Sequence, residues 1–194
     1  MQHAAALSDG PRARTAYTNG EVGVLLFLAT EVMLFAGLVS AVLVLRSADP
    51  AWSAGRAHVS GGAGAIGTAL LAAGSIVLAL ALSRARRGEG GGALRGALVL
   101  SALAGAAFVA LLVFEWRAQF AAGFDWRSGT FGSSFFVLTG LHGLHVLGGV
   151  LWCAVLALRP ATRPGAAHAA KLASWYGFLV DGVWLALLGL FYVA

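Results

Sequence analysis

Residues Ser133–Leu158 read SSFFVLTGLHGLHVLGGVLWCAVLAL, an unbroken run that contains no Asp, Glu, Lys or Arg. A helix needs about 20 apolar residues to cross about 30 Å of hydrocarbon, because it rises about 1.5 Å per residue. This run meets that length. Four further segments also meet it, and they are Val22–Leu45, Gly62–Ser83, Ala93–Phe114 and Leu172–Val193. The sequence therefore predicts an all-α integral membrane protein with a bundle of five transmembrane helices.

The composition favours the same class. Of the 194 residues, 59% are hydrophobic and 11% are charged, whereas a water-soluble domain carries about a quarter charged residues. The net charge of +5 would suggest nucleic acid in a soluble protein, but the basic residues here lie between apolar segments. We predict no nucleic-acid partner. We interpret residues 1–21 as a cytoplasmic N-terminal segment and residues 22–194 as one transmembrane domain.

The Lys and Arg residues between the apolar segments are distributed asymmetrically. With the N-terminus in the cytoplasm, the inner side holds nine of them, namely Arg12, Arg14, Arg84, Arg86, Arg87, Arg95, Arg159, Arg163 and Lys171. The outer side holds four, namely Arg46, Arg56, Arg117 and Arg127. Cytoplasmic loops carry an excess of such residues, so the predicted orientation is N-in and C-out. Three tryptophans are predicted at the outer helix ends, namely Trp52, Trp116 and Trp126.

Ionisable side chains fall near the middle of three predicted helices, where an acid costs roughly 2.5–3.5 kcal/mol to insert. They are Glu31 in the first helix, His142 and His145 in the fourth, and Asp181 in the fifth, with Thr139 on the stripe of the two histidines. Three interpretations stay open. In the first, Glu31 or Asp181 relays protons. In the second, the histidines, with Asp181, bind a metal or haem. In the third, these groups hydrogen-bond across helices or to lipid and fix the register of the bundle.

Small residues at a spacing of four predict close approach of membrane helices. Two such ladders occur, one formed by Gly61, Ala65, Ala69 and Ala73 and the other by Ala97, Ser101 and Gly105. The single cysteine, Cys153, lies within an apolar run and is interpreted as a small buried core residue.

Three segments and one acid carry a resemblance to a known family. The segment ATEVMLFAG at Ala29–Gly37 resembles the (S/T)-E-V-x-x-F-x-G segment of haem–copper oxidase subunit III. FGSSFFVLTGLHGLHV at Phe131–Val146 closely matches that family's G-S-(T/S)-F-(F/Y)-V-x-T-G-x-H-G-L-H-V signature. WYGFLVDGVW at Trp175–Trp184 is similar to its closing W-Y-x-H-F-V-D-V-V-W. Glu115 falls where the family has a Glu after its third apolar run.

The chain departs from the family pattern in two respects. It resembles the short form with five helices, in which two N-terminal helices of the long form are absent or fused to subunit I. In the closing motif, Phe178 occupies the place of the family's His, and Gly177 stands where an aromatic residue is usual.

The resemblance implies a non-catalytic subunit III of an aa3-type cytochrome c oxidase in the bacterial plasma membrane. Haem a and copper belong to partner subunits, whereas this chain binds phospholipid, stabilises subunit I as its main partner, contacts subunit II and small subunits, and supports proton uptake. No catalytic, cofactor-binding or metal-ligating residue is expected in this chain. The residues carried over as polar, lipid-cleft or proton-antenna candidates are Glu31, Glu115, Thr139, His142, His145, Asp181 and Trp184.

Other functions stay open at this point. A quinol oxidase subunit III or a nitric oxide reductase accessory protein belongs to the same superfamily, and the electron donor is bound by other subunits. An autonomous proton-coupled transporter would use Glu31 and Asp181, although transporters usually contain internal repeats with broken helices. A membrane metalloenzyme would use the two histidines. The sequence contains no phosphate-binding loop, zinc-binding cysteine pair or nucleophile elbow.

Overall fold

The computed structural model describes residues 17–87, 91–159 and 165–193. Its elements are α1 (Asn19–Ala48), α2 (Trp52–Arg56), α3 (Gly61–Arg86), α4 (Gly91–Ala121), α5 (Gly129–Leu158), α6 (Ala166–Leu188) and the π-helical turn η1 (Gly189–Val193). Five of these helices are long and apolar enough to cross a membrane, which confirms the all-α fold. Most of the predicted N-terminal segment, and the middle of two predicted linkers, lie outside the described residues.

The helices extend beyond their predicted ends. Helix α4 continues past Phe114, where the third apolar segment was predicted to end, to Ala121, so the predicted end is wrong and Glu115 lies within the helix. Hydropathy falls at Glu115 because polar residues follow it, but Arg and Gln are good helix formers and the backbone ladder continues. The Gln119 amide also donates to the carbonyl of His58, at 3.4 Å, which holds this extended end of α4 against the α2–α3 connection.

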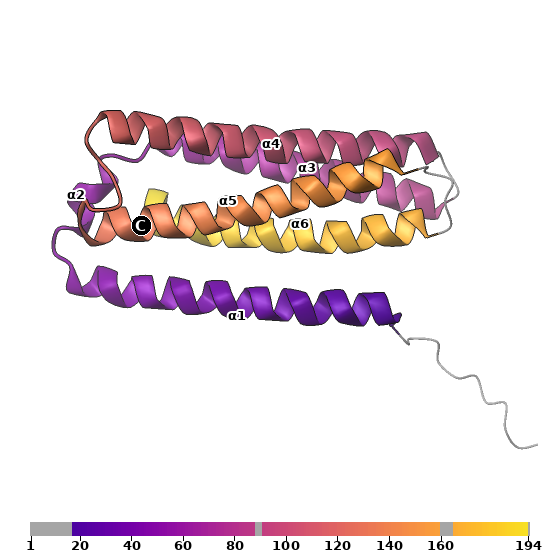
Figure 1. The fold of residues 1–194 in the computed structure, drawn as a ribbon, viewed down its shortest axis with the longest axis horizontal. Coiled ribbons are helices and arrows are strands. Elements are labelled where there is room, and N and C mark those ends of the chain that lie inside the picture. Colours follow the sequence, from indigo (N-terminus) through magenta and orange to yellow (C-terminus); the bar gives the residue numbers. More distant parts are fainter. Residues whose placement is uncertain (1–16, 88–90, 160–164, 194) are drawn as a thin grey trace, which may run out of the picture.

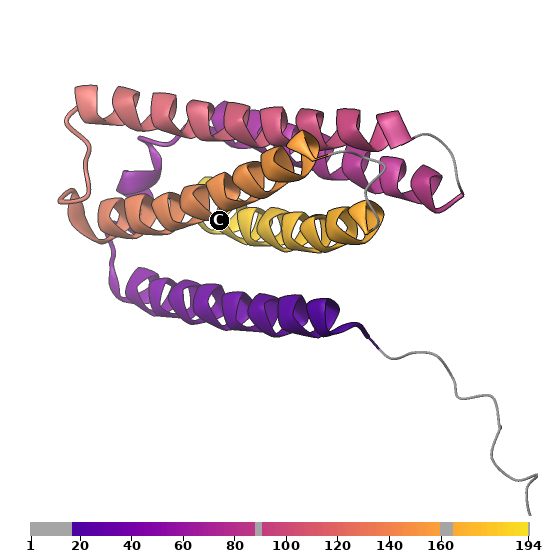
Figure 2. The ribbon, with the colours of Figure 1, turned by 45° about the vertical axis from the view of Figure 1, so that its right-hand side comes forward.

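Helices α3, α4, α5 and α6 form a four-helix bundle, and α1 lies apart from it, on the side of α5 and α6 (Figure 1). Figure 2 shows the same separation from a second direction. Of an apolar 18-residue stretch of α1, only 6% is buried among the described residues. The corresponding stretches of the other four long helices are 28–39% buried. Most of the apolar surface of α1 is therefore left for contact with something other than this chain.

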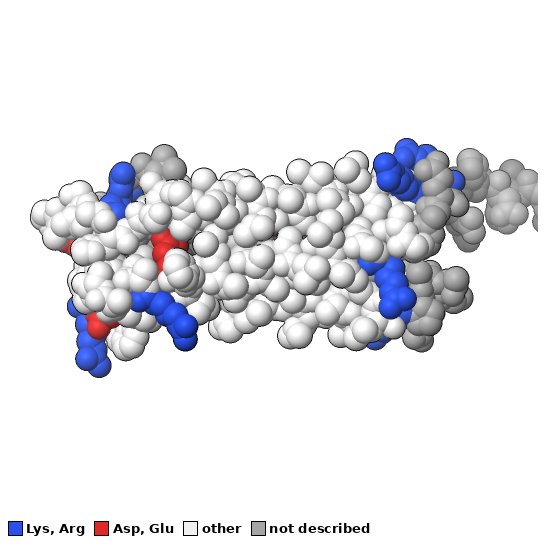
Figure 3. Space-filling view, turned by 90° about the horizontal axis from the view of Figure 1, so that it is seen from above, with Lys and Arg blue, Asp and Glu red and all other residues white. Residues whose placement is uncertain are grey.

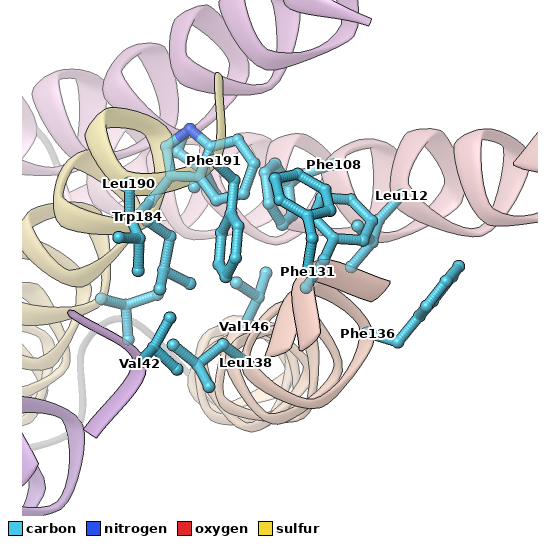
Figure 4. Close-up of a cluster of buried hydrophobic side chains, with 14 of the residues drawn as sticks. Val42, Phe108, Leu112, Phe131, Phe136, Leu138, Val146, Trp184, Leu190 and Phe191 are labelled. Carbon is cyan, nitrogen blue, oxygen red and sulfur yellow. The ribbon is translucent and has the colours of Figure 1, made fainter. Parts of the chain in front are cut away.

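Aromatic side chains form the core at the end of the bundle that holds α2. Phe135 and Phe191 are fully buried and meet edge to face, with 5.5 Å between ring centroids. Phe131 stacks on Phe135 and packs against Trp52, so α2 is fastened to the start of α5. Figure 4 shows Phe131 and Phe191 among the labelled side chains of this cluster. Such edge-to-face pairs contribute beyond the apolar area that they bury.

A second core lies toward the other end and is built from smaller side chains. It includes Leu78, Leu82, Leu94, Leu98 and Cys153. Cys153 is 6% exposed, which confirms its interpretation as a buried core residue.

The predicted packing ladder on α3 is wrong. Its four residues, from Gly61 to Ala73, are all exposed, and the buried stripe of α3 instead runs through Gly64, Gly67, Leu71, Gly74 and Leu78. The four residues lie on the side of α3 away from the bundle, because large core residues such as Phe108 pack on the side of Gly67 and Leu71.

The predicted ladder on α4 is confirmed, because Ala97 and Gly105 are buried and Ser101 is half-buried. A Cβ atom on Gly105 would lie 2.7 Å from Cγ2 of Val150, so α4 and α5 approach too closely there for a side chain.

Charged residues gather at the two ends of the molecule. The face in Figure 3 has Lys and Arg at both ends and a broad uncharged band between them. This distribution matches a bundle that crosses a hydrocarbon layer, with its charges in the aqueous phases.

Candidate functional site

Glu31 and His145 meet where α1 faces the bundle. Oε2 of Glu31 lies 2.7 Å from Nε2 of His145, and the two side chains are 13% and 17% exposed. The edge of the Phe35 ring covers the imidazole, with 5.0 Å between centroids. Because Phe35 follows Glu31 by one helical turn, both side chains project from the same face of α1. An acid near the middle of a membrane helix thus has a specific partner on another helix.

Both ring nitrogens of His145 have hydrogen-bond partners. Its Nδ1 lies 2.7 Å from the carbonyl oxygen of Leu141, which can only accept, so Nδ1 donates this bond. Its Nε2 lies 2.7 Å from Oε2 of Glu31. The imidazole is thus held between its own helix and α1.

Tyr176 of α6 joins the same junction. Its hydroxyl donates to the carbonyl oxygen of His145, at 2.8 Å, and its ring stacks with Phe27 of α1, with 6.1 Å between centroids. The sequence motif contained Tyr176, but its contact with a backbone carbonyl has no signal in sequence. Three helices thus meet around His145.

A second polar contact holds the N-terminal end of α1. Glu21 accepts from Nζ of Lys171 on α6, at 2.6 Å. Glu21 also forms a capping box with Thr18, in which each side chain bonds the other residue's backbone N–H. His168 lies 3.3 Å from the Thr18 hydroxyl. Sequence reasoning missed this cluster, although the T-x-x-E spacing that begins at Thr18 is a signal for the cap.

His142 faces the interior of the four-helix bundle instead. It is fully buried, stacks on Trp184 at 5.4 Å and meets Phe108 edge to face at 5.5 Å. Neither ring nitrogen has a hydrogen-bond partner among the described residues. Thr139, one turn earlier, is also fully buried and donates to the carbonyl of Phe135 in its own helix. The two histidines of the motif therefore serve different interfaces.

The remaining candidates occupy separate places in the fold. Glu115 accepts from the backbone N–H of Ser60 at 3.2 Å and from the Tyr192 hydroxyl at 2.9 Å, so it joins the start of α3 to the end of the chain. The Trp184 indole donates to the Thr68 hydroxyl at 2.9 Å. Asp181 lines a partly open cavity within the four-helix bundle, which Ser75 of α3 also lines.

The seven candidate residues thus do not form one site. The structure brings Glu31 and His145 together, and it places His142 beside Trp184, but Asp181 and Glu115 belong to other interfaces. Within residues 17–87, 91–159 and 165–193, no group of three or more His, Cys, Asp or Glu side chains is arranged to hold a metal ion. A centre formed by both histidines and Asp181 has no counterpart in this geometry.

The fold and its internal polar pairs define a multi-span helical membrane subunit with a large uncovered apolar surface. The family model for cytochrome c oxidase subunit III matches residues 9–194. The chain belongs to this family and is a subunit III of a haem–copper oxidase, which is an oxidoreductase complex.

Individual relatives have similar lengths to this chain. Cytochrome c oxidase subunit 3 of Corynebacterium diphtheriae is 33% identical over 172 residues, which cover 86% of this chain and 83% of the relative. The subunit 3 of Thermostichus vulcanus is 31% identical over 177 residues, covering 89% and 86%. The cytochrome bo(3) ubiquinol oxidase subunit 3 of Pseudomonas putida is 30% identical over 183 residues, covering 91% and 88%.

Proposed function

We propose that this chain is the subunit III of an aa3-type cytochrome c oxidase in a bacterial plasma membrane, oriented N-in and C-out. Haem a and copper reside in the partner subunits, which reduce dioxygen to water and pump protons. This chain contacts subunit I, contributes lipid-binding surface and supports proton uptake. The cytochrome c oxidase relatives, at 33% identity over most of the chain, support the cytochrome c type.

One observation carries this proposal, namely the way in which α1 is held. Only 6% of an apolar 18-residue stretch of α1 is buried among the described residues. Glu31 of this helix is nevertheless hydrogen-bonded to His145 of α5. Phe35 and Val42 of α1 are also buried against the bundle, so the bond between Glu31 and His145 adds a polar contact to a small apolar one. The uncovered surface of α1 and the neighbouring bundle then offers apolar area to phospholipid and to subunit I. The hydrogen bond between Glu31 and His145 fixes the distance between α1 and the bundle along that surface.

A quinol oxidase is the second candidate for the parent complex. The relative in Pseudomonas putida belongs to a ubiquinol oxidase and matches 91% of this chain. The donor-binding site lies in other subunits, so the purified complex decides between the two candidates. Turnover with reduced cytochrome c supports our choice, and turnover with quinol alone favours the alternative.

Glu31→Ala in the assembled oxidase tests the role of the pair. We expect unchanged haem content, fewer retained phospholipids and a shorter active lifetime during turnover. Thr30→Ala is the matched control, because the neighbouring Thr30 hydroxyl is exposed and bonds only the carbonyl of Phe27 in its own helix. Loss of haem from an otherwise assembled complex would place Glu31 near the redox chemistry and contradict the proposal.

A further inference from the structure

The four-helix bundle contains a cavity of about 50 Å³ that shares Tyr176 with the junction of α1 with the bundle. Residues of α3, α4, α5 and α6 all contribute to its wall. Most of the wall is apolar, but polar side chains from all four helices also face it. These are Ser75, Ser101, Cys153, Ser174, Tyr176 and Asp181.

Glycines make the room for this cavity. Gly177 of α6 lines it, and a Cβ atom there would lie 3.4 Å from the Ser75 hydroxyl oxygen, at ordinary contact distance. Gly149 of α5 also lines it, and its Cβ would lie 3.3 Å from the Tyr176 ring. Gly105 of α4 lines the cavity as well, so small residues of three helices form part of its wall.

The polar groups of the wall have more hydrogen-bonding capacity than their mutual contacts use. Asp181 and Ser75 line the same cavity, as do Cys153 and Ser101. A carboxyl group alone has about four acceptor sites. Leaving such a group without partners in an apolar interior costs about 1–3 kcal/mol. Water in a polar cavity removes that cost, and a cavity larger than about 10–15 Å³ can hold one molecule.

We propose that this cavity is an intramembrane hydration site. It holds about one or two ordered water molecules, since each occupies about 30 Å³. The waters bridge Asp181 to Ser75, Ser101 and Ser174, so that α3, α4 and α6 share one hydrogen-bond network. The site lies within the α3–α6 bundle and does not depend on which oxidase the chain serves.

The test compares Gly177→Val with Gly182→Val in the complex purified with its own companion subunits. Gly182 lies on the same helix but is exposed, with no atom within 4 Å of its added Cβ, so it controls for valine in α6. In a cryo-EM map that resolves water, we expect discrete peaks within hydrogen-bond distance of Asp181 in the wild type and in Gly182→Val. Gly177→Val displaces them. Where valine prevents assembly, Gly177→Ala removes at least one peak.

The single cysteine provides a second readout in the same samples. Modification of Cys153 by methyl methanethiosulfonate is followed by intact mass. We expect the wild type to be modified, and Gly182→Val to react at the same rate. The rate is expected to fall at least tenfold in Gly177→Val. An empty cavity in the wild-type map, a continuous density typical of an acyl chain, or equal rates in all three proteins would overturn the proposal.

Discussion

Breaking the contact between Glu31 and His145 is expected to loosen α1 by an amount that a double-mutant cycle can measure. The variants are Glu31→Ala, His145→Ala and the double substitution. Glu31→Ala leaves Nε2 of His145 without a partner in a place where the ring is 17% exposed. A buried polar group without a partner costs about 1–3 kcal/mol. Hydrogen bonds between membrane helices average about 0.6 and reach about 1.7 kcal/mol in such cycles.

The geometry places this pair toward the upper part of that range. The 2.7 Å contact is short, and it joins a carboxyl group to an imidazole, a pair that forms strong hydrogen bonds. Each side chain is also covered to more than four-fifths. We therefore expect a coupling free energy of about 1–2 kcal/mol, and 1.4 kcal/mol corresponds to about a tenfold change in an equilibrium constant. Glu31→Gln retains a donor toward Nε2 and is expected to cost less than Glu31→Ala.

The assay is unfolding of the purified chain in mixed micelles with increasing dodecyl sulfate, followed by far-UV circular dichroism and tryptophan fluorescence. Thr30→Ala serves as the control and is expected to change the free energy of unfolding by at most about 0.5 kcal/mol, as an exposed substitution does. Residues that do not interact give effects that add within about 0.3–0.5 kcal/mol. A coupling below that limit would refute the reasoning, because it would mean that the two groups do not interact.

Two further substitutions test the packing of the bundle. Gly105→Ala forces a methyl group against Val150 and is expected to destabilise the chain by about 1–3 kcal/mol in thermal unfolding. Gly96→Ala on the same helix is the control, because a Cβ atom added there has no neighbouring atom within 4 Å, and it should be neutral or stabilising. Thr68→Val keeps the shape but removes the acceptor of the Trp184 indole, with an expected loss of about 1–3 kcal/mol; an unchanged midpoint would show that this hydrogen bond does not contribute to stability.

Much of the fold was predictable because a lipid solvent restricts the chain so strongly. Long uncharged runs such as Ser133–Leu158 have few alternatives to a spanning helix, since every backbone polar group must be satisfied within the segment. Helix ends were less predictable, because they depend on caps and side-chain contacts. For this reason the third apolar segment was predicted to end before Glu115, although Ser60 and Tyr192 bind its carboxylate within the folded bundle.

The candidate site was predictable as a set of residues but not as an arrangement. Mid-helix acids and histidines stand out against an apolar background, so Glu31, His142 and His145 were found directly. Their partners depend on how each helix is rotated and which helix lies beside it. A difference of about 60° around α5 sends His145 toward Glu31 and His142 toward Trp184. No local pattern in the sequence encodes that division.

The same limit explains the misplaced stripe on α3. Ala65 and Ala69 are as small as the glycines that pack, and they follow a familiar spacing. They are nevertheless exposed, while Gly67 and Gly74 face the bundle. A side chain's size therefore permits close approach, but the buried face is decided by the large residues that fill the core, such as Phe108, which contacts Gly67.

Purification through a tag on this chain in mild detergent tests the central claim most directly. The account predicts that oxidase subunits I and II co-purify, that the complex gives the reduced-minus-oxidised spectrum of haem a, and that the chain, once separated, retains no iron or copper. A separated chain that keeps stoichiometric iron or copper, or a tagged chain that emerges from native membranes without oxidase subunits, would contradict it.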